Sequence, residues 1–221
     1  GQKDQTRISA ENLLSCCGFS CGQGCNGGYP EAAWNYFKGT GLVTGWLYNT
    51  SNYCQPYSLP PCDHHTTGKY TPCTGDSATP KCTKTCTSGY PTPYANDVHK
   101  ASSVYSIASN VAKIQTEIQT NGPVEAAFTV YADFPTYKLV YTITSAGLPS
   151  EYSSSINKGH AIKIIGWGVE SGTPYWTVAN SWNEDWGDKG FFKIRRGVNE
   201  CGIEGSIVAG MPILRGELIT E

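Results

Sequence analysis

The sequence of 221 residues lacks long apolar runs, which limits the kinds of protein that it can encode. No stretch approaches the roughly 18 apolar residues that a membrane-spanning helix needs. Charged side chains are few and balanced, with 16 basic and 18 acidic residues, a net charge of −2 and no basic stripe. We therefore expect neither a nucleic acid nor a membrane as a partner.

Methionine is also rare: it occurs only at position 211, and the polar start 1–5 does not resemble a signal peptide. Cysteine, by contrast, is abundant, because nine of the ten cysteines lie between Cys16 and Cys86. Asn49 begins an Asn-Thr-Ser triplet, which is an acceptor for N-glycosylation. These two features favour the secretory route. We therefore expect residue 1 to be a processing or truncation point.

The pattern of the chain changes along its length. The first 40 residues are predicted to be helical with loops, including a helix that begins at Pro30 and stops at Gly39. Residues 42–100 show no sustained period and are predicted to form long loops fixed by disulfides. Val111, Ile114 and Ile118 recur at helical spacing and predict a second helix that stops at 121–123.

The later part of the chain reads as β-structure. Strands are predicted over five apolar, β-branched or aromatic segments: 124–131, 160–170, 174–182, 190–197 and 206–211. A helical, disulfide-rich half followed by a β half predicts the α+β class with two lobes. The segment 145–155 is predicted to be a surface loop.

Histidine is scarce, with four residues in all, yet His64 and His65 are adjacent and lie between Cys62 and Cys73. Zinc sites usually present cysteine pairs two to four residues apart, with a second pair at regular separation. The cysteines from 16 to 25 lack that spacing, and two neighbouring histidines are poorly placed to ligate one ion. Disulfides are therefore favoured, and neither a metal nor a cofactor is expected. Considered alone, the histidine pair is most simply read as solvated loop residues.

A second set of residues suggests nucleophilic catalysis. Cys25 is rejected as the nucleophile because a flexible Asn-Gly-Gly turn follows it and no aromatic residue is next to it. His160 stands at the start of a predicted strand, and Asn180 ends another, two residues before Trp182. An amide that accepts from one ring nitrogen leaves the other nitrogen to exchange a proton with a thiol. A lone histidine on a strand is, however, more often structural.

Several longer strings resemble the papain family of cysteine peptidases: CNGGYP, NGPVEAAF, GHAIKIIGWG, PYWTVANSWNEDWGDKGFFKIRRG and CGIE. PPCDHH…PC is similar to the occluding loop of its cathepsin B-like members. The resemblance runs from about Ile8 to Pro212. It implies a papain-like two-lobe fold, with a helical, disulfide-rich left lobe, a β-barrel-like right lobe and the active-site cleft between them. Residues 1–100 would be a partial left lobe that includes the occluding loop, 62–73. Residues 101–221 would be mainly the right lobe, with the C-terminal tail crossing back.

The resemblance also implies roles for single residues. His160 would be the base, Asn180 would orient its ring, and Trp182 would cover the pair. His64 and His65 would bind the C-terminal carboxylate of a peptide, which favours removal of dipeptides. Substrate backbone and second-subsite contacts would come from Gly27, Gly28, Tyr29, Pro30, Ala127 and Ala161.

The sequence departs from the family pattern at the nucleophile. The family's Cys-Trp pair and its upstream Gln are absent, and both are expected to precede residue 1, so this chain alone is expected to be inactive. Cys201 would be a free thiol, and the partner of Cys25 would lie in the missing segment. The disulfides implied by the family pattern are Cys16–Cys82, Cys17–Cys21, Cys54–Cys86 and Cys62–Cys73.

Two further departures concern specificity and the loop. Ser206 replaces an acidic residue at the base of the second subsite, so we expect an apolar or aromatic preference there. Tyr70, next to Lys69, replaces the arginine that anchors the loop to an aspartate, which is retained as Asp185. Because lysine offers a point charge and no bidentate fork, the loop is expected to be held more loosely.

The sequence therefore predicts the larger part of a cathepsin B-like endopeptidase and peptidyl-dipeptidase, lysosomal or secreted. It would be either the heavy chain of a two-chain form or an incomplete chain. Expected partners are peptide and protein substrates, an N-terminal light chain or missing segment, a propeptide and cystatin-type inhibitors. The alternative is a secreted binding module that has lost the nucleophile. Retention of His160, Asn180 and Trp182 argues against that alternative.

Overall fold

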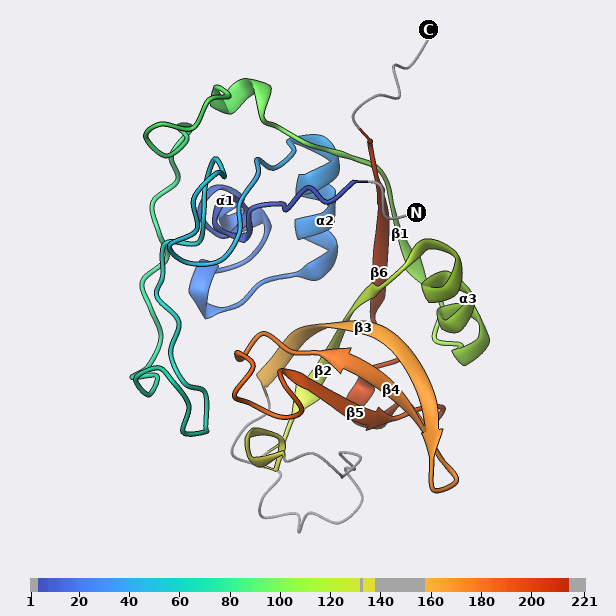
Figure 1. The fold of residues 1–221 in the computed structure, drawn as a ribbon. Coiled ribbons are helices and arrows are strands. Elements are labelled where there is room, and N and C mark those ends of the chain that lie inside the picture. The colour runs from blue at the N-terminus through green and yellow to red at the C-terminus, as the bar shows by residue number, and fades with distance from the viewer. Residues whose placement is uncertain (1–3, 132, 138–157, 215–221) are drawn as a thin grey trace, which may run out of the picture. The chain divides into compact units, whose positions relative to one another are not determined.

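The structure is a computed structural model, and it describes residues 4–131, 133–137 and 158–214. The predicted loop at 145–155 lies outside these residues. The chain forms two compact units (Figure 1). The first unit takes in the chain up to residue 60, residues 75–104 and the chain from 210 on. The second unit takes in residues 61–74 and 105–209.

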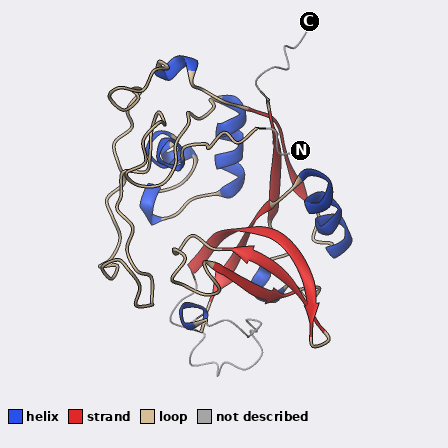
Figure 2. Ribbon diagram, viewed as in Figure 1, coloured by secondary structure: helices blue, strands red, loops and turns tan. Residues whose placement is uncertain are grey.

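The first unit is built from short helices and loops (Figure 2). Its α-helices are α1 (Ala10–Cys16) and α2 (Pro30–Gly39), and its 3₁₀ turns are Gly18–Ser20, Gly24–Asn26 and Tyr94–Asn96. Helix α1 begins where the Ser9 side chain accepts a hydrogen bond from the Asn12 N–H, which satisfies one free donor of the first turn. Proline at the first position of α2 suits a helix start, as the sequence predicted.

Disulfides and buried polar groups fix the loops of this unit. Cys16 is bonded to Cys82, Cys17 to Cys21, and Cys54 to Cys86; in the second unit Cys62 is bonded to Cys73. These are the four pairs that the family resemblance implied. Asn12 is fully buried and donates to Gln55 Oε1 at 2.9 Å and to the Tyr94 hydroxyl at 3.0 Å. Long loops of low apolar content are thus held by covalent and polar ties.

The strands form one six-stranded sheet in the order β1-β6-β2-β3-β4-β5. The pairs β2–β3, β2–β6, β3–β4 and β4–β5 are antiparallel. The elements of this part of the chain are β1 (Ala101–Ile107), α3 (Val111–Asn121), β2 (Val124–Val130), a 3₁₀ turn (Phe134–Thr136), β3 (Lys158–Glu170), β4 (Thr173–Ala179), β5 (Phe191–Arg195), a 3₁₀ turn (Glu200–Gly202) and β6 (Ile207–Pro212).

A hydrophobic core packs the strands and helix α3 of the second unit together. Along β2, buried and half-buried residues alternate strictly, as expected of a strand with one face in the core. Ile114 and Ile118 of α3 are buried in the same cluster. The largest fully buried side chains here are aromatic: Trp176, Trp186, Phe134 and Phe192. This rigid apolar cluster supports the strands that carry the candidate site.

The observed elements confirm the α+β class and the predicted helices and strands, to within a few residues at the ends. Strand β1 was not predicted, because its sequence ASSVYSI alternates weakly and is only partly buried. The family resemblance assigns residues 62–73 to the N-terminal part of the chain. In the structure they group with the second unit. The Cys62 carbonyl accepts a hydrogen bond from the Asn183 side chain, and the Lys69 N–H donates one to the Asp185 carboxylate.

Candidate active site

His160 and Asn180 come from neighbouring strands of the sheet. His160 is the third residue of β3, and Asn180 directly follows β4, which pairs with β3. His160 Nε2 lies 2.8 Å from Asn180 Oδ1. The same oxygen accepts from the Ser181 backbone N–H at 2.8 Å, which fixes it as the acceptor. His160 must therefore donate from Nε2, so Nδ1 carries the lone pair when the ring is neutral.

The surroundings of His160 are mainly aromatic. The Phe128 and Phe134 rings lie 5.9 and 6.4 Å from the imidazole, centroid to centroid. Burial lowers the pKa of His160 below its ordinary value, and the hydrogen bond to Asn180 offsets part of that shift. The ring is thus held in one orientation with one nitrogen available as a base.

Trp182 contacts all three histidines of the second unit. Its ring centroid lies 5.4 Å from that of His160, 5.4 Å from that of His65 and 5.5 Å from that of His64. The planes of His64 and Trp182 are nearly parallel, at 3°. Phe134 packs against Trp182 at 5.2 Å and links it to the core. One indole therefore joins the histidine pair of the loop to the His160–Asn180 pair.

The loop from Cys62 to Cys73 is closed by its disulfide and attached to the segment after β4. The Asn183 side chain donates to the Cys62 carbonyl at 2.6 Å. Within the loop, Asp63 is only 4% exposed, and its carboxylate accepts from the N–H of Gly68 at 2.7 Å and of Tyr70 at 3.2 Å. The sequence alone indicates no role for Asp63. An aspartate five residues before a glycine in a short stapled loop is a signal that could have indicated such a turn.

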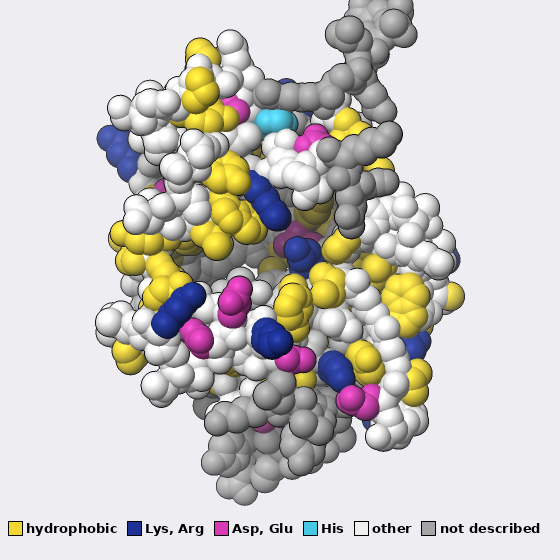
Figure 3. Space-filling model, viewed as in Figure 1, with side chains coloured by type: hydrophobic (Ala, Val, Ile, Leu, Met, Phe, Trp, Pro, Cys, Tyr) yellow, Lys and Arg dark blue, Asp and Glu magenta, His cyan; other side chains and the backbone are white. Residues whose placement is uncertain are grey.

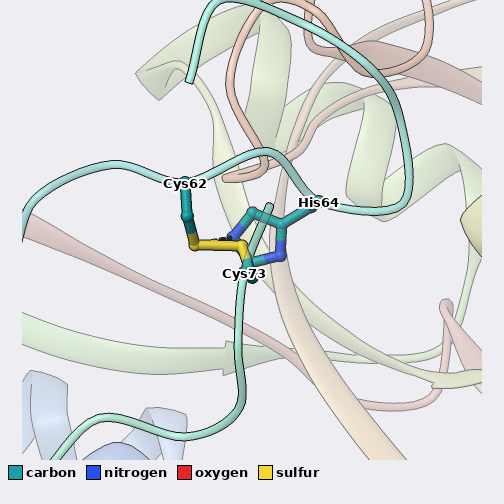
Figure 4. Close-up of side chains that lie close together, drawn as sticks. All are labelled: Cys62, His64 and Cys73. Carbon is teal, nitrogen blue, oxygen red and sulfur yellow. Dashed lines mark hydrogen bonds between the residues drawn. A yellow bond between two sulfur atoms is a disulfide. The ribbon is translucent and has the colours of Figure 1, made fainter. Parts of the chain in front are cut away.

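Figure 4 shows that His64 points toward the sulfurs of Cys62 and Cys73. His64 Nε2 lies 4.0 Å from Cys62 Sγ. The two sulfurs are joined in a disulfide, and a metal ligand must be a thiolate, so this cluster does not offer a metal site as it stands. Burial lowers the pKa of His64, and the neighbouring His65 and His160 lower it further.

Asp185 meets the loop through its backbone. The Lys69 N–H lies 3.4 Å from Asp185 Oδ2, and the Asp185 carboxylate also packs against Gly68. The Lys69 ammonium lies 5.0 Å from the Tyr70 ring centroid. The Asp185 carboxylate therefore contacts the loop at the backbone of Gly68 and Lys69.

Three predicted substrate-binding residues lie in the second unit. Ala127 of β2 is paired with Ala161 of β3, next to His160. Ser206 is exposed and directly precedes Ile207, which pairs with Ala126. These residues thus lie close together on neighbouring strands.

Four others lie in the first unit: Gly27, Gly28, Tyr29 and Pro30. The Gly27 N–H donates to the Gly24 carbonyl, and its own carbonyl accepts from the Gln23 N–H. Both Gly27 groups that could bind a substrate backbone are therefore engaged within the turn. Gly28 forms a bridge with Gly22, and Tyr29 is 68% exposed. Pro30 begins α2.

Among the described residues, Cys25 and Cys201 are free cysteines. Cys201 is buried, and burial together with Glu200 and Asp133 raises the pKa of its thiol to about 12. It is therefore a buried thiol with little tendency to ionise. Asn49 is exposed and has a φ of 60° in a turn, so a glycan could be attached there without displacing packed atoms.

Figure 3 shows basic and acidic side chains interspersed on the face drawn, without a patch of one sign. In the described part of the chain, every helix is too short or too polar to cross a lipid bilayer.

A histidine oriented by an amide, with its other ring nitrogen free of a hydrogen bond, is an arrangement that hydrolases with an activated nucleophile use. The family model described as "Papain family cysteine protease" matches residues 1–211. The chain belongs to this family.

Curated relatives refine the match. The chain is 53% identical to "Cathepsin B-like cysteine proteinase 5" of Caenorhabditis elegans over 215 residues, covering 95% of this chain and 60% of that protein. It is 49% identical to "Cathepsin B-like cysteine proteinase" of Schistosoma japonicum over 212 residues, covering 96% and 60%. The chain thus spans about three fifths of the length of these relatives.

Solved structures share the fold. "proCathepsin B S9 from Trypanosoma congolense" matches with a TM-score of 0.74 and 38% identity, over 95% of this chain and 62% of that one. "Structure of digestive procathepsin L 3 of Tenebrio molitor larval midgut" matches with a TM-score of 0.64 and 21% identity, over 94% and 56%. The papain-like fold expected from the sequence is confirmed.

Proposed function

We propose that this chain supplies the base and the carboxylate-binding loop of a cathepsin B-like cysteine peptidase. The observation that carries the proposal is the His160–Asn180 hydrogen bond of 2.8 Å, which leaves His160 Nδ1 free. In the complete protein a cysteine from a segment outside this chain forms a thiolate–imidazolium pair with His160. The thiolate attacks the peptide carbonyl, and His160 then protonates the leaving amine. Trp182 shields the His160–Asn180 bond from water.

The same protein would remove C-terminal dipeptides as well as cleave internal bonds. His64 and His65 stand together on Trp182, close to His160. When protonated, they can donate charge-assisted hydrogen bonds to a peptide's terminal carboxylate. Because the substrate's C-terminal carboxylate is held close to the base, it sets the number of substrate residues between the scissile bond and the C-terminus.

The test uses the full-length protein with its upstream sequence. We expect an upstream cysteine followed by tryptophan, cleavage of an internal peptide bond, and loss of that activity in His160→Ala. The double variant His64→Ala/His65→Ala should lose dipeptide release and keep internal cleavage. Equal loss of both activities would exclude the carboxylate-binding role.

Ser206 sets the proposed subsite preference. A serine offers no negative charge to an arginine of the substrate, so apolar or aromatic residues should be preferred there. Phe-Arg substrates should therefore be cleaved faster than Arg-Arg substrates, and Ser206→Glu should narrow the difference. Efficient Arg-Arg cleavage by the unaltered protein would contradict this assignment.

The second candidate is a secreted peptide- or protein-binding module without catalysis. A serine in place of the expected upstream cysteine would support it. For either candidate we propose a lysosomal or secreted protein, glycosylated at Asn49, with a propeptide and cystatin-type inhibitors among its partners. Enzymatic removal of N-glycans, followed by mass measurement, tests the modification.

A further inference from the structure

The loop that carries His64 and His65 is held by a buried carboxylate. Asp63 precedes the histidine pair, is 4% exposed, and bonds to the N–H groups of Gly68 and Tyr70 on the returning half of the loop. Its own backbone N–H donates to the Thr71 carbonyl at 2.8 Å. One residue therefore joins both halves of the loop beside the histidines.

This arrangement differs from a loop held by an ion pair. Lys69, the basic residue next to Asp185, has its ammonium over the Tyr70 ring and donates its backbone N–H to the Asp185 carboxylate, whose charge attracts the ammonium less strongly than Tyr70 does. Hydrogen bonds from backbone N–H groups to a buried carboxylate are charge-assisted and keep one geometry. The loop thus has an internal tie that needs no side-chain cation.

We propose that Asp63 is the positioning residue that holds His64 and His65 in place to receive a substrate carboxylate. The proposal rests on the proposed dipeptidase function. Asp63 fixes the turn at Gly68 and Tyr70, the disulfide closes the loop at its base, and Asn183 attaches Cys62 to the segment after β4. His64 then stacks on Trp182 with the two ring planes nearly parallel.

The experiment compares three variants of the full-length protein. Asp63→Asn removes the charge and one acceptor with little change in shape. It should lower kcat/KM for dipeptide release about tenfold, mainly through KM, because the carboxylate is received less often in the correct geometry. Lys69→Ala tests the ionic alternative, and Asp76→Asn is the matched control, an exposed aspartate just beyond the loop. These two should stay within about twofold of the unaltered protein.

Internal cleavage reports whether each variant folds and should be unchanged in all three. The proposal is overturned if Asp63→Asn matches Asp76→Asn, if Lys69→Ala gives the larger loss, or if Asp63→Asn lowers both activities equally. Amide hydrogen exchange gives a test that needs no activity. The N–H groups of Gly68 and Tyr70 should exchange slowly in the unaltered protein, and fast exchange there would refute the tie. An unaltered protein with slow exchange but no dipeptide release would instead refute the proposed function.

Discussion

Replacing Glu204 by glutamine should destabilise the second unit more than any exposed charge change. Glu204 is 5% exposed, and its Oε1 accepts from Trp176 Nε1 at 2.9 Å and from the Gly197 N–H at 2.6 Å. Its Oε2 accepts from the Asn199 N–H at 2.9 Å. The carboxylate therefore joins β4, which leads to Asn180, to the turn after β5.

The magnitude follows from the acceptors that are lost. A glutamine can keep the two bonds at one oxygen, but its amide group then faces the Asn199 N–H, donor against donor. Losing one charge-assisted bond and leaving a buried donor unpaired costs about 2–4 kcal/mol of the free energy of unfolding. For a chain of this size that corresponds to a fall in Tm of roughly 5–15 °C.

The assay is thermal unfolding of the full-length protein, with Glu170→Gln as the matched control. Glu170 pairs with Lys193 at 2.9 Å on the surface, where such a pair is worth about 1 kcal/mol or less. Glu170→Gln should therefore shift Tm by less than about 4 °C. If Glu204→Gln shifts Tm no more than Glu170→Gln does, the structural importance of this network is refuted.

Four further predictions concern the site and its loop. Gly68→Ala should abolish dipeptide release and spare internal cleavage, because a Cβ there would lie 2.5 Å from the Asp185 carboxylate. If the variant releases dipeptides at the rate of the unaltered protein, the loop adapts to the added methyl group. Asn180→Ala should lower kcat/KM for internal cleavage about 10–100-fold, since the His160 ring loses its fixed tautomer; a change below about twofold would contradict that role. The pKa of His64 is lowered from its ordinary 6.5, so the ratio of dipeptide release to internal cleavage should rise as pH falls through that lowered pKa. Between the ordinary pKa of 6.5 and the lowered pKa of His64, the free energy of unfolding should fall as pH falls, because the unfolded chain binds a proton that the half-buried His64 ring does not yet bind; a flat urea-unfolding profile would contradict this.

The parts of the fold that local sequence signals define were predictable. Helix α3 is capped at its start by Asn110, whose side chain accepts from the Lys113 N–H, and at its end by Gly122, which has a φ of 108°. Both residues are readable signals of a helix start and stop. Strand β1 gave no such signal, because its neighbour in the sheet is β6, about a hundred residues later in the chain. A short serine-rich segment that pairs with so distant a strand has no clear strand pattern in its own sequence.

In the candidate site, too, some residues were predictable from the sequence and others were not. His160, Asn180 and Trp182 were predicted as a group from strand ends and family strings, and the structure places them together. Asp63 and Glu204 were missed as organising residues because their partners are mostly backbone N–H groups. Side-chain patterns in a sequence do not indicate which backbone donors will turn inward.

The role proposed for His160 is to activate a cysteine thiol that cleaves peptide bonds. Its most direct test is the rate of thiol alkylation in the full-length protein as a function of pH, with the modified cysteine located by mass spectrometry. An upstream cysteine should react rapidly well below the ordinary thiol pKa of about 8.5, and His160→Ala should return its reaction to that ordinary pH range. Reaction that follows an ordinary thiol in both proteins, or labelling confined to Cys25, would contradict it.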